Sequence, residues 1–192
     1  MKKKFMLLTI ALVLVVSLMA GCTSKAPVQE PAKEPETTET TSEPADAVSS
    51  ASVVSDETSF EKGISKDGTF IVLTTKDLVF ENDLVVDGTF TKKDKEGKDV
   101  ITRSLAFAAN GADGKMERYS VTVPNLIINS ENTLLEYGIL KGDIYIQAPG
   151  FKTKDATVEG NLYFATQELM DAFTIDELTN ITGEVAVKEI NK

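Results

Sequence analysis

The chain contains no histidine, no tryptophan and a single cysteine, Cys22. Without histidine it lacks the commonest general base and the commonest transition-metal ligand, and a serine–histidine triad in its usual form is excluded. A lone cysteine excludes a disulfide within one chain. The absence of tryptophan weakens the case for a typical sugar-binding platform. These absences argue against the common hydrolytic and metal-dependent chemistries.

The first 21 residues combine a positively charged start with an uninterrupted apolar run. Lys2, Lys3 and Lys4 precede the 16 uncharged residues 5–20. This order is typical of a secretory signal. At about 1.5 Å of rise per helical residue, the run falls short of a hydrocarbon core of roughly 30 Å. A permanent transmembrane helix is therefore the weaker interpretation.

The apolar run ends in small residues directly before the cysteine, with Leu18 further back and then Ala20, Gly21 and Cys22. This stretch resembles the lipobox of bacterial lipoproteins, a resemblance that covers the first 22 residues. It implies cleavage between Gly21 and Cys22, a diacylglyceryl thioether on the Cys22 sulfur and acylation of the new amino terminus. Two or three acyl chains would hold the protein firmly to the bilayer on its extracytoplasmic side. The alternative is a signal anchor or a plain signal peptide with a chance cysteine.

Residues 22–58 are predicted to form a disordered tether that starts at the lipidated cysteine. Positions 23–58 hold four prolines, two lysines and eight acidic residues, with no aromatic residue before Phe60. Such a segment buries too little apolar surface to fold and serves as a spacer, the alternative being a motif for a partner. Without residues 1–21 the chain carries 17 basic and 30 acidic residues, a net charge of −13. That charge argues against nucleic acid and against anionic lipid head groups as partners.

Residues 59–192 are predicted to form one all-β extracytoplasmic domain. Its first half is rich in hairpin signals, with a charged tip over residues 92–99 and turn dipeptides at Asn110-Gly111 and Asp113-Gly114. Residues 166–173 are predicted to form one short helix capped by Thr166, with an apolar face that closes one edge of the domain.

Three segments of the second half share one pattern of glycine, polar, apolar, variable and apolar residues: 142–146, 160–164 and 183–187. Their glycines lie 18 and 23 residues apart, and the longer gap contains the predicted helix. A repeat of this size indicates stacked units, with each glycine at a corner and the two apolar residues pointing inward. The segments also resemble the repeats of bactofilins, the polymer-forming cytoskeletal β-helix family. We therefore expect a short parallel β-helix or β-solenoid, the alternative being a β-sandwich or a β-roll.

Tyr145 and Tyr163 occupy the same position of this pattern and are predicted to lie side by side on an outer face. They are the candidate binding surface, for a sugar ring or another subunit, and their alternative role is an aromatic ladder that supports the sheet. The acidic turns match no calcium loop, so we expect no metal and no cofactor. No pair of carboxylates and no serine with a base can be recognised, so we expect no enzyme.

Together these features indicate a membrane-anchored extracytoplasmic lipoprotein with a non-catalytic β domain for binding or scaffolding at the cell envelope. Its partners would be the bilayer, through the Cys22 lipid, and a cell-wall polymer or an envelope protein. The first alternative is a self-assembling, polymer-forming surface protein, and the second is a cell-wall-active hydrolase.

Overall fold

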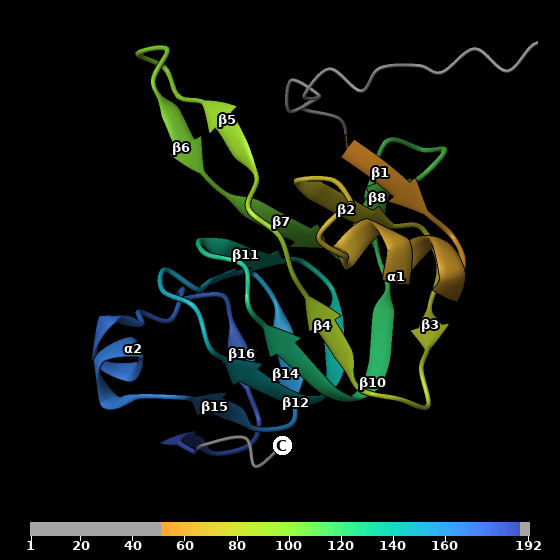
Figure 1. Cartoon of the computed structure of the whole chain (residues 1–192). Coiled ribbons are helices and arrows are strands. Elements are labelled where there is room, and N and C mark those ends of the chain that lie inside the picture. The colour runs from red at the N-terminus through yellow and green to blue at the C-terminus, as the bar shows by residue number, and fades with distance from the viewer. Residues whose placement is uncertain (1–50, 189–192) are drawn as a thin grey trace, which may run out of the picture. The chain divides into compact units, whose positions relative to one another are not determined.

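The computed structural model describes residues 51–188, which form a mostly β domain with two short helices (Figure 1). The helices are α1 (Glu57–Ile64) and α2 (Gln167–Ala172). The strands are β1 (Ala51–Val54), β2 (Ile71–Thr74), β3 (Leu78–Val79), β4 (Leu84–Val86), β5 (Thr91–Lys93), β6 (Asp99–Ile101), β7 (Arg103–Ala106), β8 (Ala108–Asn110), β9 (Met116–Arg118), β10 (Ser120–Ile128), β11 (Thr133–Glu136), β12 (Ile139–Ile146), β13 (Lys152–Lys154), β14 (Thr157–Glu159), β15 (Leu162–Phe164), β16 (Asn180–Ile181) and β17 (Val185–Val187). No helix in this part of the chain is long and apolar enough to cross a membrane. The predicted signal peptide, Gly21, Cys22 and most of the predicted tether lie outside the described residues.

Two larger sheets hold most of the strands, and both are parallel throughout. The five-stranded sheet A has the order β1-β2-β7-β11-β13. In the eight-stranded sheet B, β10 pairs with β3, β4 and β12, and the pairing continues from β12 through β14 to β16 and through β15 to β17. Among residues 51–188 antiparallel pairing occurs only in the hairpins β5–β6 and β8–β9, where the turn signals predicted it. An antiparallel sandwich therefore does not describe these sheets.

The core of sheet B is built from side chains that stack on equivalent positions of neighbouring strands. One row in register contains Leu84, Leu126, Ile144, Leu162 and Val185, and the next contains Val86, Ile128, Ile146, Phe164 and Val187. The members of both rows from β4 to β15 are buried. The inward positions predicted from the glycine pattern are thus buried in two of the three segments, 142–146 and 160–164. In the third segment, 183–187, Val185 and Val187 are exposed by 44% and 41%.

The three glycines of the pattern stack on one another, with Gly142 inside β12, Gly160 between β14 and β15, and Gly183 between β16 and β17. A Cβ atom on Gly160 would lie 2.1 Å from the carbonyl oxygen of Gly142, and one on Gly183 would lie 2.4 Å from that of Gly160. The following polar side chains stack as well, because Asp143 Oδ1 accepts the Asn161 backbone N–H at 2.8 Å and Asn161 Oδ1 accepts that of Glu184 at 2.9 Å. Close backbone approach therefore requires glycine at these corners.

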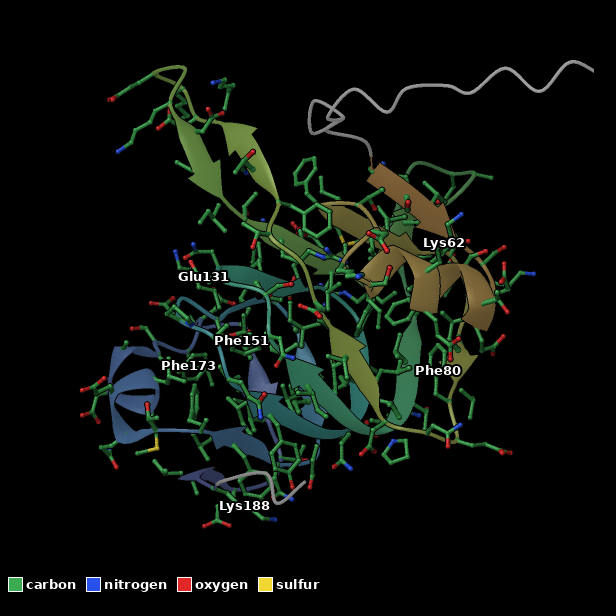
Figure 2. The ribbon with its side chains drawn as sticks, in the orientation of Figure 1. Lys62, Phe80, Glu131, Phe151, Phe173 and Lys188 are labelled. Atoms are coloured by element: carbon green, nitrogen blue, oxygen red, sulfur yellow. The ribbon has the colours of Figure 1, made fainter. Side chains whose placement is uncertain are left out.

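Helix α2 agrees with the sequence prediction in position, cap and apolar face. The Thr166 hydroxyl oxygen accepts the backbone N–H of Leu169 at 3.3 Å. The side chains of Leu169, Met170 and Phe173 pack against the core. The Phe173 ring lies between those of Phe164 and Phe151, with centroid distances of 5.3 and 6.0 Å (Figure 2).

The amino-terminal boundary of the domain differs from the expectation. Residues 51–58, assigned to the tether, form β1 and the start of α1, and α1 is a second helix where only one was expected. The Asp56 carboxylate caps α1 by accepting the Ser59 backbone N–H at 2.9 Å, and Phe60 and Ile64 are buried in the core. A strand of only four residues leaves too weak a periodic pattern to be recognised beside an acidic, serine-rich segment.

Candidate functional site

The two hairpins, β5–β6 and β8–β9, directly precede and follow one strand, β7, which is the middle strand of sheet A. The β5–β6 hairpin ends just before Arg103, at the start of β7, and the β8–β9 hairpin begins just after Ala106, at its end. In Figure 1 the β5–β6 hairpin projects beyond one end of β7, and β8 lies near the other end. We call the outer face of sheet A between the two hairpins the cradle.

The floor of the cradle consists of the outward residues of sheet A, which form two rows. Register aligns Ile71, Ser104 and Leu134 in one row, and Leu73, Ala106 and Glu136 in the other. Four of these six side chains are aliphatic, so the floor is mainly apolar. The sheet thus presents an apolar face that its own core does not use.

A hollow of about 280 Å³ lies at the β8–β9 end of the cradle. Ile71, Leu73 and Ala106 form its floor, while Ala109 and Met116 of the hairpin line its side. Met116 is 47% exposed although it is a large apolar residue. Such a hollow suits an aliphatic group of a ligand.

A larger hollow of about 580 Å³ lies at the β5–β6 end. Val100, Ile101 and Leu134 supply its apolar surface. Lys92, Lys98 and Lys152 line it together with Asp99, Thr102 and Asn132. Apolar contact and positive charge are therefore combined at this end of the cradle.

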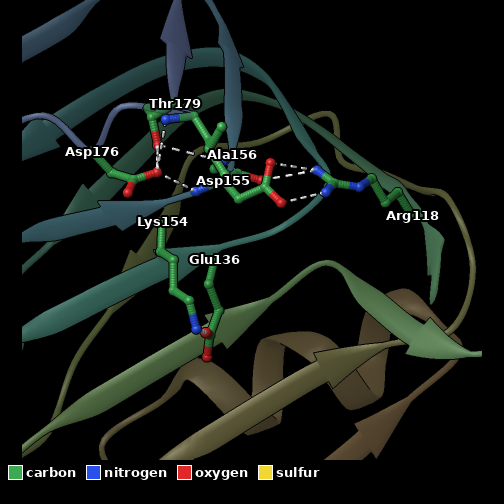
Figure 3. Close-up of polar contacts among 8 residues, drawn as sticks. Arg118, Glu136, Lys154, Asp155, Ala156, Asp176 and Thr179 are labelled. Atoms are coloured by element: carbon green, nitrogen blue, oxygen red, sulfur yellow. Dashed lines mark hydrogen bonds and ion pairs between the residues drawn. The ribbon is translucent and has the colours of Figure 1, made fainter.

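Glu136 is the carboxylate of the cradle floor, and its neighbours hold it in place. Its Oε1 accepts a hydrogen bond from the Ser104 hydroxyl at 2.7 Å, and its Oε2 lies 3.6 Å from Lys154 Nζ (Figure 3). Tyr137 and Glu136 raise the pKa of Lys154 above its usual value, which favours the protonated form of this lysine. The hydrogen bond and the ion pair thus hold the Glu136 carboxylate in one position beside the Ser104 hydroxyl.

A second ion pair lies beside the cradle, between Arg118 of β9 and Asp155, which follows β13 (Figure 3). Arg118 Nη1 also donates to the Asp155 carbonyl oxygen at 3.0 Å. The hydrogen bonds from Arg118 hold the pKa of the Asp155 carboxyl below its usual value. Asp176 Oδ2 accepts the Asp155 backbone N–H at 2.8 Å, so the base of the β8–β9 hairpin is tied to the chain after α2.

Beneath the base of the β5–β6 hairpin lies Arg103, a fully buried cation that the sequence analysis did not identify. Its Nη2 donates to the Gly63 carbonyl at 2.6 Å, its Nη1 donates to the Asp87 carbonyl at 3.3 Å, and its Cζ lies 4.1 Å from the Phe90 ring centroid. Burial lowers the pKa of Arg103 to about 10. The guanidinium thus connects α1 to the segment that leads into the hairpin, and nothing in the surrounding sequence marks it as buried.

Tyr145 and Tyr163 are adjacent, as predicted, with ring centroids 5.0 Å apart in paired strands of sheet B. Tyr163 is only 8% exposed and Tyr145 is half-buried. Lys188 Nζ lies 4.2 Å from the Tyr163 centroid and 5.7 Å from the Tyr145 centroid (Figure 2). This geometry matches the supporting ladder better than an open platform for a sugar ring.

Among residues 51–188 no group of three or more acidic side chains is placed to hold a metal ion. No family model, no curated protein and no solved structure matches this chain. The cradle is therefore interpreted from its own geometry.

Proposed function

We propose that the chain is a lipid-anchored extracytoplasmic protein whose β domain is a non-catalytic binding module, with the cradle as its binding face. The anchor would be the lipid on Cys22. The partner would be a polymer or a protein of the cell envelope. The observation that carries the proposal is the pair of hairpins at the two ends of β7, which enclose an apolar face with two hollows.

The fold that presents the cradle is proposed to be a short parallel β-solenoid. Three features support this. From β7 to β14 the strands of sheets A and B alternate along the chain, apart from the β8–β9 hairpin; the pairing within both sheets is parallel, and the glycines at positions 142, 160 and 183 stack on one another. In a solenoid the turns between strands can lengthen without disturbing the stacked core. The two hairpins around β7 would be such lengthened turns. They form walls beside the outer face of sheet A, while the stacked rows of core side chains continue beneath that face.

Replacing Met116 by glutamate tests the cradle without touching the core. The Met116→Glu variant is expressed as the full lipidated chain in the native cells. It should no longer crosslink to the envelope material that crosslinks to the wild-type protein. Val79→Glu is the matched control, because Val79 is a large apolar residue of sheet B, 62% exposed and outside the cradle. Equal loss with both variants, or no loss with Met116→Glu, would refute the cradle as the binding face.

The anchor is tested separately by Cys22→Ser. The serine variant should not incorporate a fatty-acid analogue and should leave the membrane fraction, because the thiolate is the atom that would carry the lipid. A variant that remains labelled would exclude lipidation at this position.

Self-association is the second candidate function, and one observation favours it. Val185 and Val187 occupy core-facing positions but are exposed, and within the described part of the chain no strand pairs with the far side of β17. An uncovered edge of this kind pairs readily with another chain. At the other end α1 covers the core through Phe60 and Ile64, and among residues 51–188 β1 leaves an edge of sheet A without a partner strand.

Light scattering coupled to size-exclusion chromatography distinguishes the two candidates. Self-association predicts a species larger than the monomer at micromolar concentration, which Val185→Lys should convert to monomer. A wild-type monomer at that concentration would leave only the binding module.

A further inference from the structure

We propose that the β5–β6 end of the cradle binds a linear anionic polymer whose charges are phosphodiesters. This inference rests on the proposed function, because it names the class of ligand for the same face. It depends on the basic side chains that line the larger hollow, their lack of ion-pair partners and the chemistry of the surface between them.

The lysines of this hollow are an exception within an acidic domain. Residues 51–188 carry 14 basic and 23 acidic side chains, a net charge of −9. Four of the 14 basic residues fall within the eight positions 92–99. Lys152 on the neighbouring edge of sheet A adds a fifth positive charge from a distant part of the sequence. Because positions 92–99 also contain Asp94, Glu96 and Asp99, the five lysines leave a net charge of +2 here, in a domain that is acidic as a whole.

Three of these lysines are not held in ion pairs by the acidic residues of the hairpin. Lys92, Lys98 and Lys152 form no ion pair with any described residue. Asp99 is already paired with Lys93 at 2.8 Å. Asp94 Oδ1 instead accepts the backbone N–H groups of Glu96 and Lys98 in the hairpin turn, both at 2.9 Å. Three ammonium groups thus remain free to meet an anion.

The donor set favours phosphate over a planar carboxylate. Lysine is a compact point charge and a common phosphate ligand, whereas arginine supplies the fork that matches carboxylates. Arg103 is buried beneath the hairpin and does not line the hollow. No aromatic side chain lines the hollow either, so a sugar ring has nothing to stack on.

The surface between the lysines fits the uncharged part of such a polymer. Val100, Ile101 and Leu134 lie in the same hollow, and Thr102 and Asn132 add polar groups. A polyol linker between phosphates presents carbon atoms and hydroxyl groups, which match this mixture. The remaining acidic residues repel a polyanion only weakly beyond a Debye length of about 8 Å at physiological ionic strength.

Fluorescence anisotropy tests the proposal on the full mature chain in non-ionic detergent, with labelled poly(glycerol phosphate) of defined length as the probe. Poly-glutamate of equal charge and neutral dextran serve as comparison probes. We expect binding of the phosphate polymer that weakens as salt increases, weaker binding of poly-glutamate and none of dextran.

Two triple variants with the same change in net charge separate a specific site from general attraction. The cradle variant combines Lys92→Gln, Lys98→Gln and Lys152→Gln. The control variant changes three exposed lysines elsewhere, Lys62→Gln, Lys66→Gln and Lys76→Gln. Losing three charge contacts should weaken binding about tenfold or more in the cradle variant, and the control should stay close to wild type.

Three results would overturn the inference: no binding of the phosphate polymer, equal weakening in both triple variants, or poly-glutamate binding as tightly as poly(glycerol phosphate). The last result would assign the site to an acidic polypeptide. Each leaves the Met116→Glu crosslinking experiment unaffected, so failure here can be distinguished from failure of the cradle as a binding face.

Discussion

Replacing Gly160 by alanine tests the stacking on which the whole domain depends. The added Cβ would lie 2.1 Å from the Gly142 carbonyl oxygen and 2.5 Å from its carbonyl carbon. Both atoms belong to the backbone, so no side-chain rotation can relieve the contact. The φ angle of Gly160 is not in the left-handed region, so alanine suits the local conformation and the effect isolates the contact between neighbouring strands.

The structure gives the size of the effect. Restoring a normal contact requires these segments to separate by roughly 1 Å, and such overpacking costs about 1–3 kcal/mol. The same movement would stretch the two hydrogen bonds that join these segments, from Ile144 N–H to Asn161 O, 2.9 Å, and from Asn161 N–H to Asp143 Oδ1, 2.8 Å. Each lost bond adds about 1 kcal/mol. We therefore expect Gly160→Ala to lower the free energy of unfolding by about 3–5 kcal/mol, a large part of a typical total of about 5–15 kcal/mol.

Urea denaturation followed by far-ultraviolet circular dichroism measures this change, since the chain has no tryptophan to report on unfolding. Gly97→Ala is the matched control. Gly97 has φ +80°, and a Cβ there would meet no atom within 4 Å. The control should therefore lose only about 1–2 kcal/mol, the cost of a left-handed alanine. If Gly160→Ala loses less than Gly97→Ala, the stacked corner does not stabilise the domain.

Two further predictions concern the arginines beside the cradle. Arg103→Met should lower the free energy of unfolding by about 2–4 kcal/mol in the same urea assay, because the Gly63 and Asp87 carbonyls lose their donors; a change below about 0.5 kcal/mol would contradict this. The lowered pKa of Asp155 stabilises the fold above the usual carboxyl pKa of 3.8, and this contribution disappears as pH falls below it. Arg118→Gln should therefore lower the melting temperature at pH 7 and reduce its fall between pH 4 and pH 2, and an unchanged acid profile would contradict that.

Much of sheet B could be predicted from the sequence because its pattern repeats. Glycine at a corner and apolar residues two and four positions later are local features, and the stacking of Ile144 on Leu162 follows from them. Thr166 and the apolar face of α2 are equally local signals. The charged hairpin at 92–99 was also recognisable, since charged residues around a glycine suit an exposed turn.

The cradle could not be predicted, because it depends on contacts between residues far apart in the chain. The two hairpins were visible separately, but nothing local indicates that the strand between them is the centre of sheet A. Lys152 joins the lysines of the β5–β6 hairpin only through the pairing of β11 with β13. The burial of Arg103 likewise depends on Gly63, 40 residues earlier. Tyr145 and Tyr163 show the reverse case, in which adjacency was predictable but the cover by Lys188 was not.

The position of the two insertions favours a binding role over a purely structural one. A hairpin at one end of a strand can be a neutral elaboration of a turn, because loops tolerate added length at small entropic cost. Two hairpins at opposite ends of the same strand act on the same outer face, and both contribute side chains to its hollows. Met116 is half-exposed, and Lys92 forms no ion pair with any residue of 51–188, so neither side chain adds to the core. Under the proposed binding role these are side chains that a ligand would contact, so the search for a partner should begin at the cradle.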